Sequence, residues 1–100
     1  MSKPAHIKFR LYVAGDGPNS AQAIANLNAL CREHLAERHE IEIVDVFLEP
    51  KRALADGVVL TPMLVKVWPA PIRKIIGCLS QSRPLLLALD LPEHLNGNGI

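Results

Sequence analysis

The sequence predicts a single α/β domain whose strands and helices follow one another in the order βαβαββα. Residues 6–13 alternate between polar and apolar side chains, which is typical of a strand with one buried face. Apolar residues then recur at helical spacing from residue 21 to about residue 38. Two short β-branched runs, Met63–Val67 and Ile72–Ile76, flank a proline-rich link and predict an antiparallel hairpin.

The stretch from Val58 to Ser80 contains this hairpin, and the rest of the chain is arranged around it. Its link, Trp68-Pro69-Ala70-Pro71, carries two prolines, whose fixed φ and missing N–H favour a tight connection. Thr61-Pro62 precedes the first strand, where a proline costs least because the hydrogen-bond ladder has not begun. A Thr-Pro before a strand, a hairpin and a closing helix form the second half of a thioredoxin-like fold.

The first strand places four apolar side chains on one face: Ile7, Phe9, Leu11 and Val13. Asn19 or Ser20 is expected to cap the following helix, which runs from Ala21 to about Arg38. We expect a second strand at Ile41–Leu48, apolar enough toward its end to be central in the sheet. This β-α-β unit should pair its strands in parallel.

Two further helices are expected in the second half of the chain. Pro50 is tolerated in the first turn of a short helix that Gly57 ends. A closing helix is expected at Arg83–Leu91, capped by Ser80 or Ser82. With this helix the βαβαββα order is complete.

The composition is that of an ordinary globular domain, with 49% apolar and 21% charged residues among 100. We expect one domain over residues 1–100, with an ordered core at about 6–92 and a frayed tail at 93–100. A net charge of +1 does not indicate the excess of basic side chains that nucleic-acid binding requires. The longest apolar run, Leu85–Leu89, is far shorter than the about 20 residues of a membrane span, so a cytoplasmic protein is expected.

The residues indicate no catalytic, metal or cofactor site. The turn Gly15–Asn19 lies where a thioredoxin-like enzyme carries its redox pair, but it holds no cysteine, so an ordinary capped helix start is favoured over an anion site. Cys31 lies on the apolar stripe of its helix and is interpreted as a core residue. His34 and His39 are five positions apart, which does not place them on one helical face.

The roles of several charged side chains remain open. Lys66, Arg73 and Lys74 form a local basic group on the hairpin, which is either a solvated strand face or a rim for an acidic partner. Asp45 and Asp90 lie in apolar surroundings. For both carboxylates a hydrogen-bonded or edge-exposed position is favoured over a buried functional one.

Four segments of the chain resemble the KaiB family of circadian clock proteins: LYVAGDGPNS, IVDVFLEP, LTPMLVKVWPAPIRKIIGCLS and LALDL. The similarity runs from about Ile7 to Leu91, and the pattern TP…K…P.P.RKIIG.LS is specific. The sequence departs from the family at AGDGPNS, where AGNTPNS is usual, at Cys78, where an acidic residue is usual, and at Ala88, where glycine is common.

The resemblance implies a non-enzymatic regulator that binds a KaiC-type ATPase and autokinase and alters its phosphorylation cycle, in timekeeping or in stress adaptation. It also implies two folds for one chain. A thioredoxin-like monomer would bind the partner, with Thr61-Pro62 in the cis form. A dimeric or tetrameric ground state would rearrange the second half into βααβ, so that the whole chain has the order βαββααβ.

Two sets of residues follow from this resemblance. Partner binding is expected around the second helix and the hairpin, at Asp56, Gly57, Val58, Thr61, Lys66, Arg73 and Lys74. The change of fold is expected to depend on Thr61, Pro62, Pro69, Pro71, Pro84, Ala88 and Asp90. Alanine at position 88 and proline at position 84 favour the helical, thioredoxin-like form, because alanine suits a helix better than glycine and proline removes a ladder donor.

Two other functions remain open at this point. The first is a ligand module that holds a glutathione-type peptide beside cis-Pro62 without redox chemistry. The second is a degenerate redox enzyme that uses Cys78 or Cys31.

Overall fold

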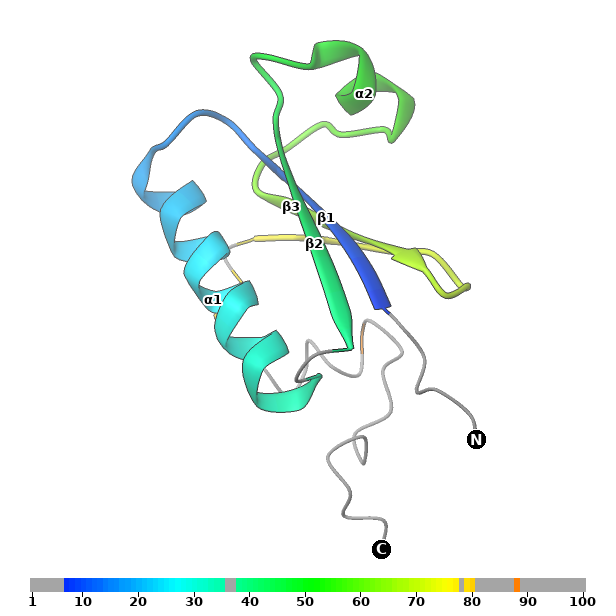
Figure 1. Ribbon diagram of the computed structural model, residues 1–100. Helices are drawn as coiled ribbons and strands as arrows, with labels where there is room; N and C mark the ends of the chain where they lie inside the picture. The colour runs from blue at the N-terminus through cyan, green and yellow to red at the C-terminus, as the bar shows by residue number, and fades with distance from the viewer. Residues whose placement is uncertain (1–6, 36–37, 78, 81–87, 89–100) are drawn as a thin grey trace, which may run out of the picture.

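The computed structural model describes residues 7–35, 38–77, 79–80 and 88. Within these residues the elements are β1 (Ile7–Val13), α1 (Pro18–His34), β2 (His39–Asp45), α2 (Pro50–Ala55), β3 (Met63–Trp68) and β4 (Arg73–Ile76). The four strands form one mixed sheet in the order β2-β1-β3-β4. Figure 1 shows α1 running alongside the sheet, whereas α2 lies at one end of it.

The strand pairings agree with the predicted topology. β1 and β2 are parallel, with Ile7 opposite His39 and Val13 opposite Asp45. β3 lies antiparallel to β1 on its other side, and β4 pairs antiparallel with β3 to form the predicted hairpin. The thioredoxin-like form of the chain is therefore the one that the structure shows.

The prediction for the second strand was wrong in its position and in its place in the sheet. β2 ends at Asp45 instead of Leu48, and it forms an edge of the sheet instead of its centre. The apolar residues 46–48, which suggested a central strand, belong to a turn. In this turn Leu48 N–H and Glu49 N–H donate to the Asp45 carbonyl. Phe47 and Leu48 in this turn are 72% and 79% exposed.

Helix α1 also differs from its predicted bounds. It begins at Pro18 with Gly17 as its N-cap, instead of after Asn19 or Ser20. Proline fits the first helical position because its φ is already helical and its missing N–H has no partner there in any case. The helix ends at His34, earlier than expected. Leu35 N–H donates to the Cys31 carbonyl at 2.8 Å and so completes the last turn.

The sheet carries an apolar cluster on each face. On the α1 face the predicted stripe of β1 is buried against the helix, and Cys31 and Leu27 pack into it. Cys31 is therefore a core residue, as predicted. On the other face a second cluster lies near α2: Tyr12, Val44, Ala53, Met63 and Val65. The sequence pattern did not indicate that β1 is buried on both faces.

The second half of the chain is described in part. α2 has its predicted bounds, and Gly57 follows it with a φ of +71°, which favours glycine. The Thr61-Pro62 peptide is cis, as the resemblance implied, and so are Trp68-Pro69 and Ala70-Pro71. Ala88 is helical and exposed. The rest of the expected closing helix, with Ser82, Pro84 and Asp90, and the tail at 93–100 lie outside the described residues.

Candidate functional site

A polar network centred on Asp56 holds the end of α2 against the sheet. Arg10 Nη1 donates to Asp56 Oδ2 at 2.9 Å, and the Tyr12 hydroxyl donates to the same oxygen at 2.5 Å. Arg10 and Tyr12 come from the central strand β1, whereas Asp56 follows α2 by one residue. The Tyr12 hydroxyl also lies 3.2 Å from the Arg52 carbonyl, so it contacts the helix at two points.

Glu42 of β2 extends this network to the edge of the sheet. It accepts from Arg10 Nε at 3.2 Å and from Arg52 Nη2 at 2.8 Å. Arg52 Nη1 also lies 2.7 Å from the second Glu42 oxygen and 3.2 Å from Glu49. Two arginines and three carboxylates therefore bridge two strands and the short helix α2.

The pKa values show how these carboxylates are held in the charged form. Burial raises the pKa of Asp56, but hydrogen bonds from Tyr12 and Arg10 outweigh it, so the pKa lies below its usual value. The hydrogen bond from Arg52 is the main reason that the pKa of Glu42 falls to about 2. Both side chains are therefore ionised at neutral pH, and the network needs no proton to form.

Three of the residues expected to bind a partner come together beside this network. Lys74 Nζ, from β4, donates to the Asp56 carbonyl at 2.7 Å. A Cβ added at Gly57 would lie 3.7 Å from Lys74 Nζ. Asp56, Gly57 and Lys74 therefore form one surface at the end of α2, although 18 positions separate Asp56 from Lys74 in the sequence.

Val58 and Thr61 lie in the segment that leads from this surface into β3. Val58 is half-buried, packs against the cluster of Tyr12 and Met63, and donates its N–H to the Ala53 carbonyl at 2.9 Å. Thr61 is also half-buried. Both residues border the surface formed by Asp56, Gly57 and Lys74 but expose little of their side chains.

The expected basic group on the hairpin does not form. Lys66 is 1% exposed, so the expectation of an exposed side chain there was wrong. Its register partners are Phe9 of β1 and Arg73 of β4, which places Lys66 and Arg73 on the α1 face. Lys74 points to the opposite face because successive strand residues alternate. Arg73 and Lys74 are both exposed, but on different faces of the sheet.

Sequence reasoning missed a set of exposed apolar side chains around α2. They lie in the two loops that flank the helix and on the helix itself: Phe47, Leu48, Leu54, Val59 and Leu60. Their exposed fractions run from 60% at Leu60 to 81% at Val59. We call these five residues the α2 apolar surface. All five come from residues 47–60, and a contiguous exposed apolar patch is typical of a protein-binding site, which makes this segment a candidate for one.

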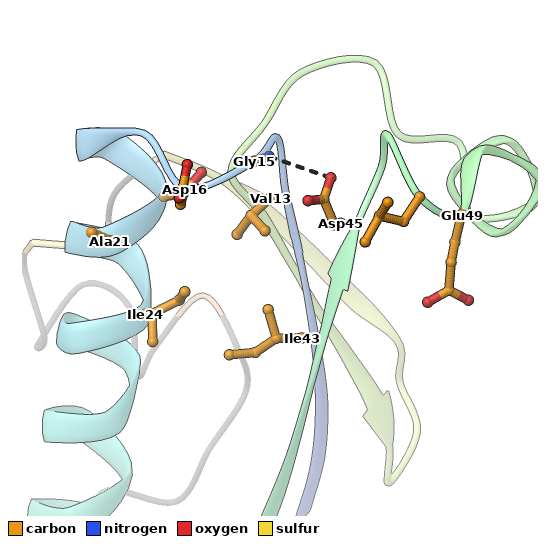
Figure 2. A pocket seen from close by; sticks show the side chains of 10 residues that line it. Val13, Gly15, Asp16, Ala21, Ile24, Ile43, Asp45 and Glu49 are labelled. Atoms are coloured by element: carbon orange, nitrogen blue, oxygen red, sulfur yellow. Dashed lines mark hydrogen bonds between the residues drawn. The ribbon is translucent and has the colours of Figure 1, made fainter.

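An open pocket of about 560 Å³ lies at the β1–α1 turn, where thioredoxin-like enzymes carry their cysteines. Figure 2 shows Ile24 of α1 and Ile43 of β2 pointing toward one another across it. Asp45 Oδ1 accepts from Gly15 N–H at 3.3 Å and from Phe47 N–H at 2.9 Å, so the predicted hydrogen-bonded role of this carboxylate is confirmed. Pro62 is not among the residues that line this pocket, so the glutathione-type site expected beside Pro62 would be a different one.

The chemistry of Cys31 does not favour a redox role. Its side chain is fully buried, and burial raises the pKa of the thiol to about 12. A thiolate is the reactive form, so this thiol is poorly suited to exchange. Cys78 lies outside the described residues. Within the described residues there is no group of three potential metal ligands, and no helix is long and apolar enough to span a membrane.

Comparison with protein families identifies the chain. The model of the KaiB domain matches residues 10–91. The chain belongs to the KaiB family. It is 42% identical over 90 residues to circadian clock protein KaiB3 of Synechocystis sp., an alignment that covers 89% of this chain and 88% of that protein. It is likewise 42% identical over 92 residues to circadian clock oscillator protein KaiB of Acaryochloris marina, covering 92% and 88% of the two chains.

Solved structures confirm the thioredoxin-like fold of this KaiB-family chain. The N-terminal domain of Synechococcus elongatus SasA superposes with a TM-score of 0.73 at 19% identity and covers 100% of this chain and 93% of that one. Mitochondrial thioredoxin 3 of Saccharomyces cerevisiae superposes with a TM-score of 0.67 at 18% identity, with 88% and 80% covered. The predicted family and fold are both confirmed, and the relatives' names describe clock components.

Proposed function

We propose that this chain is a KaiB-type regulator that binds a KaiC-type ATPase and autokinase and modulates its phosphorylation cycle. The observation that carries the proposal is the α2 apolar surface, which lies next to the surface formed by Asp56, Gly57 and Lys74. An interface core is typically apolar, and its rim is polar. Here the apolar and polar parts are adjacent and are presented by one short helix and its two loops.

The polar network explains how so short a helix presents this surface. α2 has six residues, too few to be stable by itself. Its orientation is held by contacts of Arg52 and Asp56 with Glu42, Arg10 and Tyr12 of the sheet. A surface fixed in this way loses less conformational entropy on binding than a mobile loop does.

The proposed binding residues are Asp56, Gly57, Val58, Thr61 and Lys74 together with the α2 apolar surface. Lys66 is left out because it is buried. The proposal includes the change of fold that the family implies, with the thioredoxin-like form as the binding-competent one. We further propose that the other fold assembles as a homo-oligomer, so that partner binding and self-association compete.

The test uses the full chain and a purified KaiC-type ATPase from the same organism. Leu54→Ser and Val59→Ser change side chains that are 77% and 81% exposed, so the free fold should tolerate them. Each removes apolar area from the proposed interface, and together they should weaken binding at least tenfold. Adding the double variant should then no longer change the time course of ATPase autophosphorylation.

The matched control is Ile72→Ser. Ile72 is 58% exposed, but it lies at the hairpin turn, and the strand register places that turn at the opposite end of the sheet from α2. Binding within twofold of the parent is expected for this control. Equal losses in the control and the double variant, or unchanged affinity in both, would overturn the proposal.

A further inference from the structure

Among the strands that the structure describes, β4 forms one edge of the sheet, with β3 beside it. The hairpin register decides where its backbone groups point. Gly77 N–H donates to the Pro62 carbonyl at 3.0 Å. Hydrogen-bonded and non-hydrogen-bonded pairs alternate along an antiparallel ladder, so Ile75 and Arg73 also direct their N–H and C=O groups to β3. The residues whose N–H and C=O groups face the outer edge are therefore Lys74 and Ile76.

The side chain of Lys74 does not cover this edge. Lysine on an edge strand commonly protects it against pairing with other chains. Here, however, Lys74 Nζ donates to the Asp56 carbonyl at 2.7 Å, and Asp56 also contacts Arg10 of the central strand β1. Lys74 therefore extends inward over the sheet. Apolar side chains flank the edge instead, since Ile72 and Ile76 are 58% and 51% exposed.

The charge of the β4 edge is positive. The strand has the sequence RKII, without an acidic residue, and its Arg73 is exposed on the α1 face. The residue opposite Arg73 in β3 is Lys66, which is also basic. The other edge strand, β2, differs because it carries three acidic residues: Glu40, Glu42 and Asp45. Opposite charges on facing strands attract, so the β4 edge is complementary to a strand with an acidic residue opposite Arg73.

We infer that the outer edge of β4 binds an extended peptide segment of a partner protein. The segment pairs antiparallel to β4, with an acidic residue opposite Arg73 and apolar residues opposite Ile72 and Ile76. Its main chain bonds the free backbone groups, and its side chains provide specificity. A four-residue edge suits a peptide better than a second folded chain, because a stable interface buries about 800 Å² per partner. The inference does not depend on the α2 apolar surface or on the proposed ATPase.

The test is a titration of the full chain with a synthetic peptide, acetyl-Thr-Val-Val-Thr-Glu-Val-Thr-amide. In the antiparallel register its first valine faces Ile76 and its glutamate faces Arg73. The chain has a single tryptophan, Trp68, which ends β3 at the hairpin turn and is 54% exposed, so its fluorescence reports binding. The matched peptide with lysine in place of glutamate should bind about three- to tenfold more weakly at low salt. Equal affinities of the two peptides would overturn the inference.

Two methylated peptides test the backbone pairing without changing the protein. N-methylation of the first valine and the central threonine, which lie opposite Ile76 and Lys74, removes the N–H groups that face β4 and should abolish binding. N-methylation of the second valine and the glutamate removes N–H groups that point away, and binding should stay within about twofold. Equal losses with both peptides would overturn the inference.

Variants of the chain test the same edge from the other side. Ile76→Pro and Ile76→Ala both remove the apolar side chain, but only proline removes the edge N–H, so Ile76→Pro should bind at least about fivefold more weakly. Arg73→Glu should reverse the preference between the glutamate and lysine peptides. Arg32→Glu makes the same change of charge at an exposed position of α1 and should preserve the preference.

Two results would overturn the inference. The first is a preference between the peptides that Arg73→Glu leaves unchanged. The second is self-association of the parent chain in sedimentation that Ile76→Pro abolishes, because a second copy would then occupy the edge. Loss of peptide binding with intact binding of the ATPase, or the reverse, separates this inference from the proposed function.

Discussion

Arg10 in the central strand and Asp56 at the end of α2 form an ion pair of 2.9 Å across 46 positions of sequence. Their side chains are 21% and 25% exposed, so solvent screens the pair less than a surface pair. The Tyr12 hydroxyl shares the same carboxylate oxygen. This pair joins the sheet to the helix that presents the proposed binding surface.

Asp56→Asn should lower the free energy of unfolding by about 1–2 kcal/mol at pH 7, because Arg10 keeps only Glu42 as a charged partner and Tyr12 loses a charged acceptor. Tyr12→Phe removes one hydrogen bond and should cost about 1 kcal/mol. Urea denaturation measures both changes. Glu33→Gln, an exposed carboxylate on α1, is the control and should change stability by less than about 0.5 kcal/mol. A loss in this control as large as that in Asp56→Asn would contradict the assigned role of the pair.

Glu42 predicts an acid-dependent loss of stability. Its pKa is about 2 in the folded chain and about 4.3 in an unfolded one, so the folded state favours the ionised form. The stabilisation is fully present above about pH 5 and is lost as the pH falls toward 2. Because the side chain is 37% exposed, we expect about 0.5–1 kcal/mol.

The measurement is the free energy of unfolding of the parent and of Glu42→Gln at several pH values from 7 down to 2. The two curves should differ at neutral pH and converge in acid, because the variant has no carboxylate to protonate. Asp56 contributes in the same direction and remains in both proteins. Parallel curves over the whole range would show that Glu42 is not the titrating group.

Cys31 should resist alkylation in the folded chain. The sequence has two cysteines, so Cys78→Ser leaves Cys31 as the single thiol. Burial and a pKa of about 12 leave almost no accessible thiolate at pH 8. Iodoacetamide should therefore modify this variant at least a hundredfold more slowly in buffer than in strong denaturant. Similar rates in the two solvents would reopen a redox role for this thiol.

Lys74 and Arg73 should differ in their effects on partner association. Lys74 lies beside Asp56 and Gly57, whereas Arg73, the preceding residue of β4, lies on the α1 face of the sheet. Lys74→Glu should slow association with the KaiC-type ATPase by about three- to tenfold at low salt and reduce its salt dependence. Arg73→Glu should change the rate by less than twofold. Stopped-flow mixing at two salt concentrations measures both, and equal effects would restore the single basic rim first expected from the sequence.

Ala88→Gly should favour the alternative fold. Ala88 is helical in this structure, and glycine costs about 1 kcal/mol more than alanine inside a helix. Part of that difference cancels because glycine is also unfavourable in a strand. The expected shift is a few tenths to about 1 kcal/mol, or up to about fivefold in the ratio of the two folds.

Amide NMR of the parent and the variant, with partner-binding rates, tests this proposal. The variant should show a larger population of the second fold and slower binding. Ala36→Gly places the same substitution in the first half of the chain, which keeps its order of elements in both proposed folds, and serves as the control. An alternative-fold population that is unchanged in Ala88→Gly, or raised equally in the control, would show that position 88 does not bias the two folds.

The sequence was sufficient for features that depend on residues close together in the chain. The alternation in residues 7–13, the helical spacing that became α1, and the paired runs at Met63 and Ile76 all predicted the right element type. The boundaries were less accurate where the chain leaves a regular element. Pro18 starts α1 earlier than expected, and the turn at Phe47 shortens β2.

The sequence by itself determined the family, the order of the described elements and the buried stripe of β1, because local spacing and a specific motif carry that information. The tertiary structure decided which face each hairpin residue occupies and what covers it. Lys66 is buried and Lys74 is exposed although both looked alike as basic strand residues. The Asp56 network likewise depends on strand register and on the path of α2, which bring together side chains 46 and 44 positions apart. Such contacts follow from the packing of whole elements, and no local pattern encodes them.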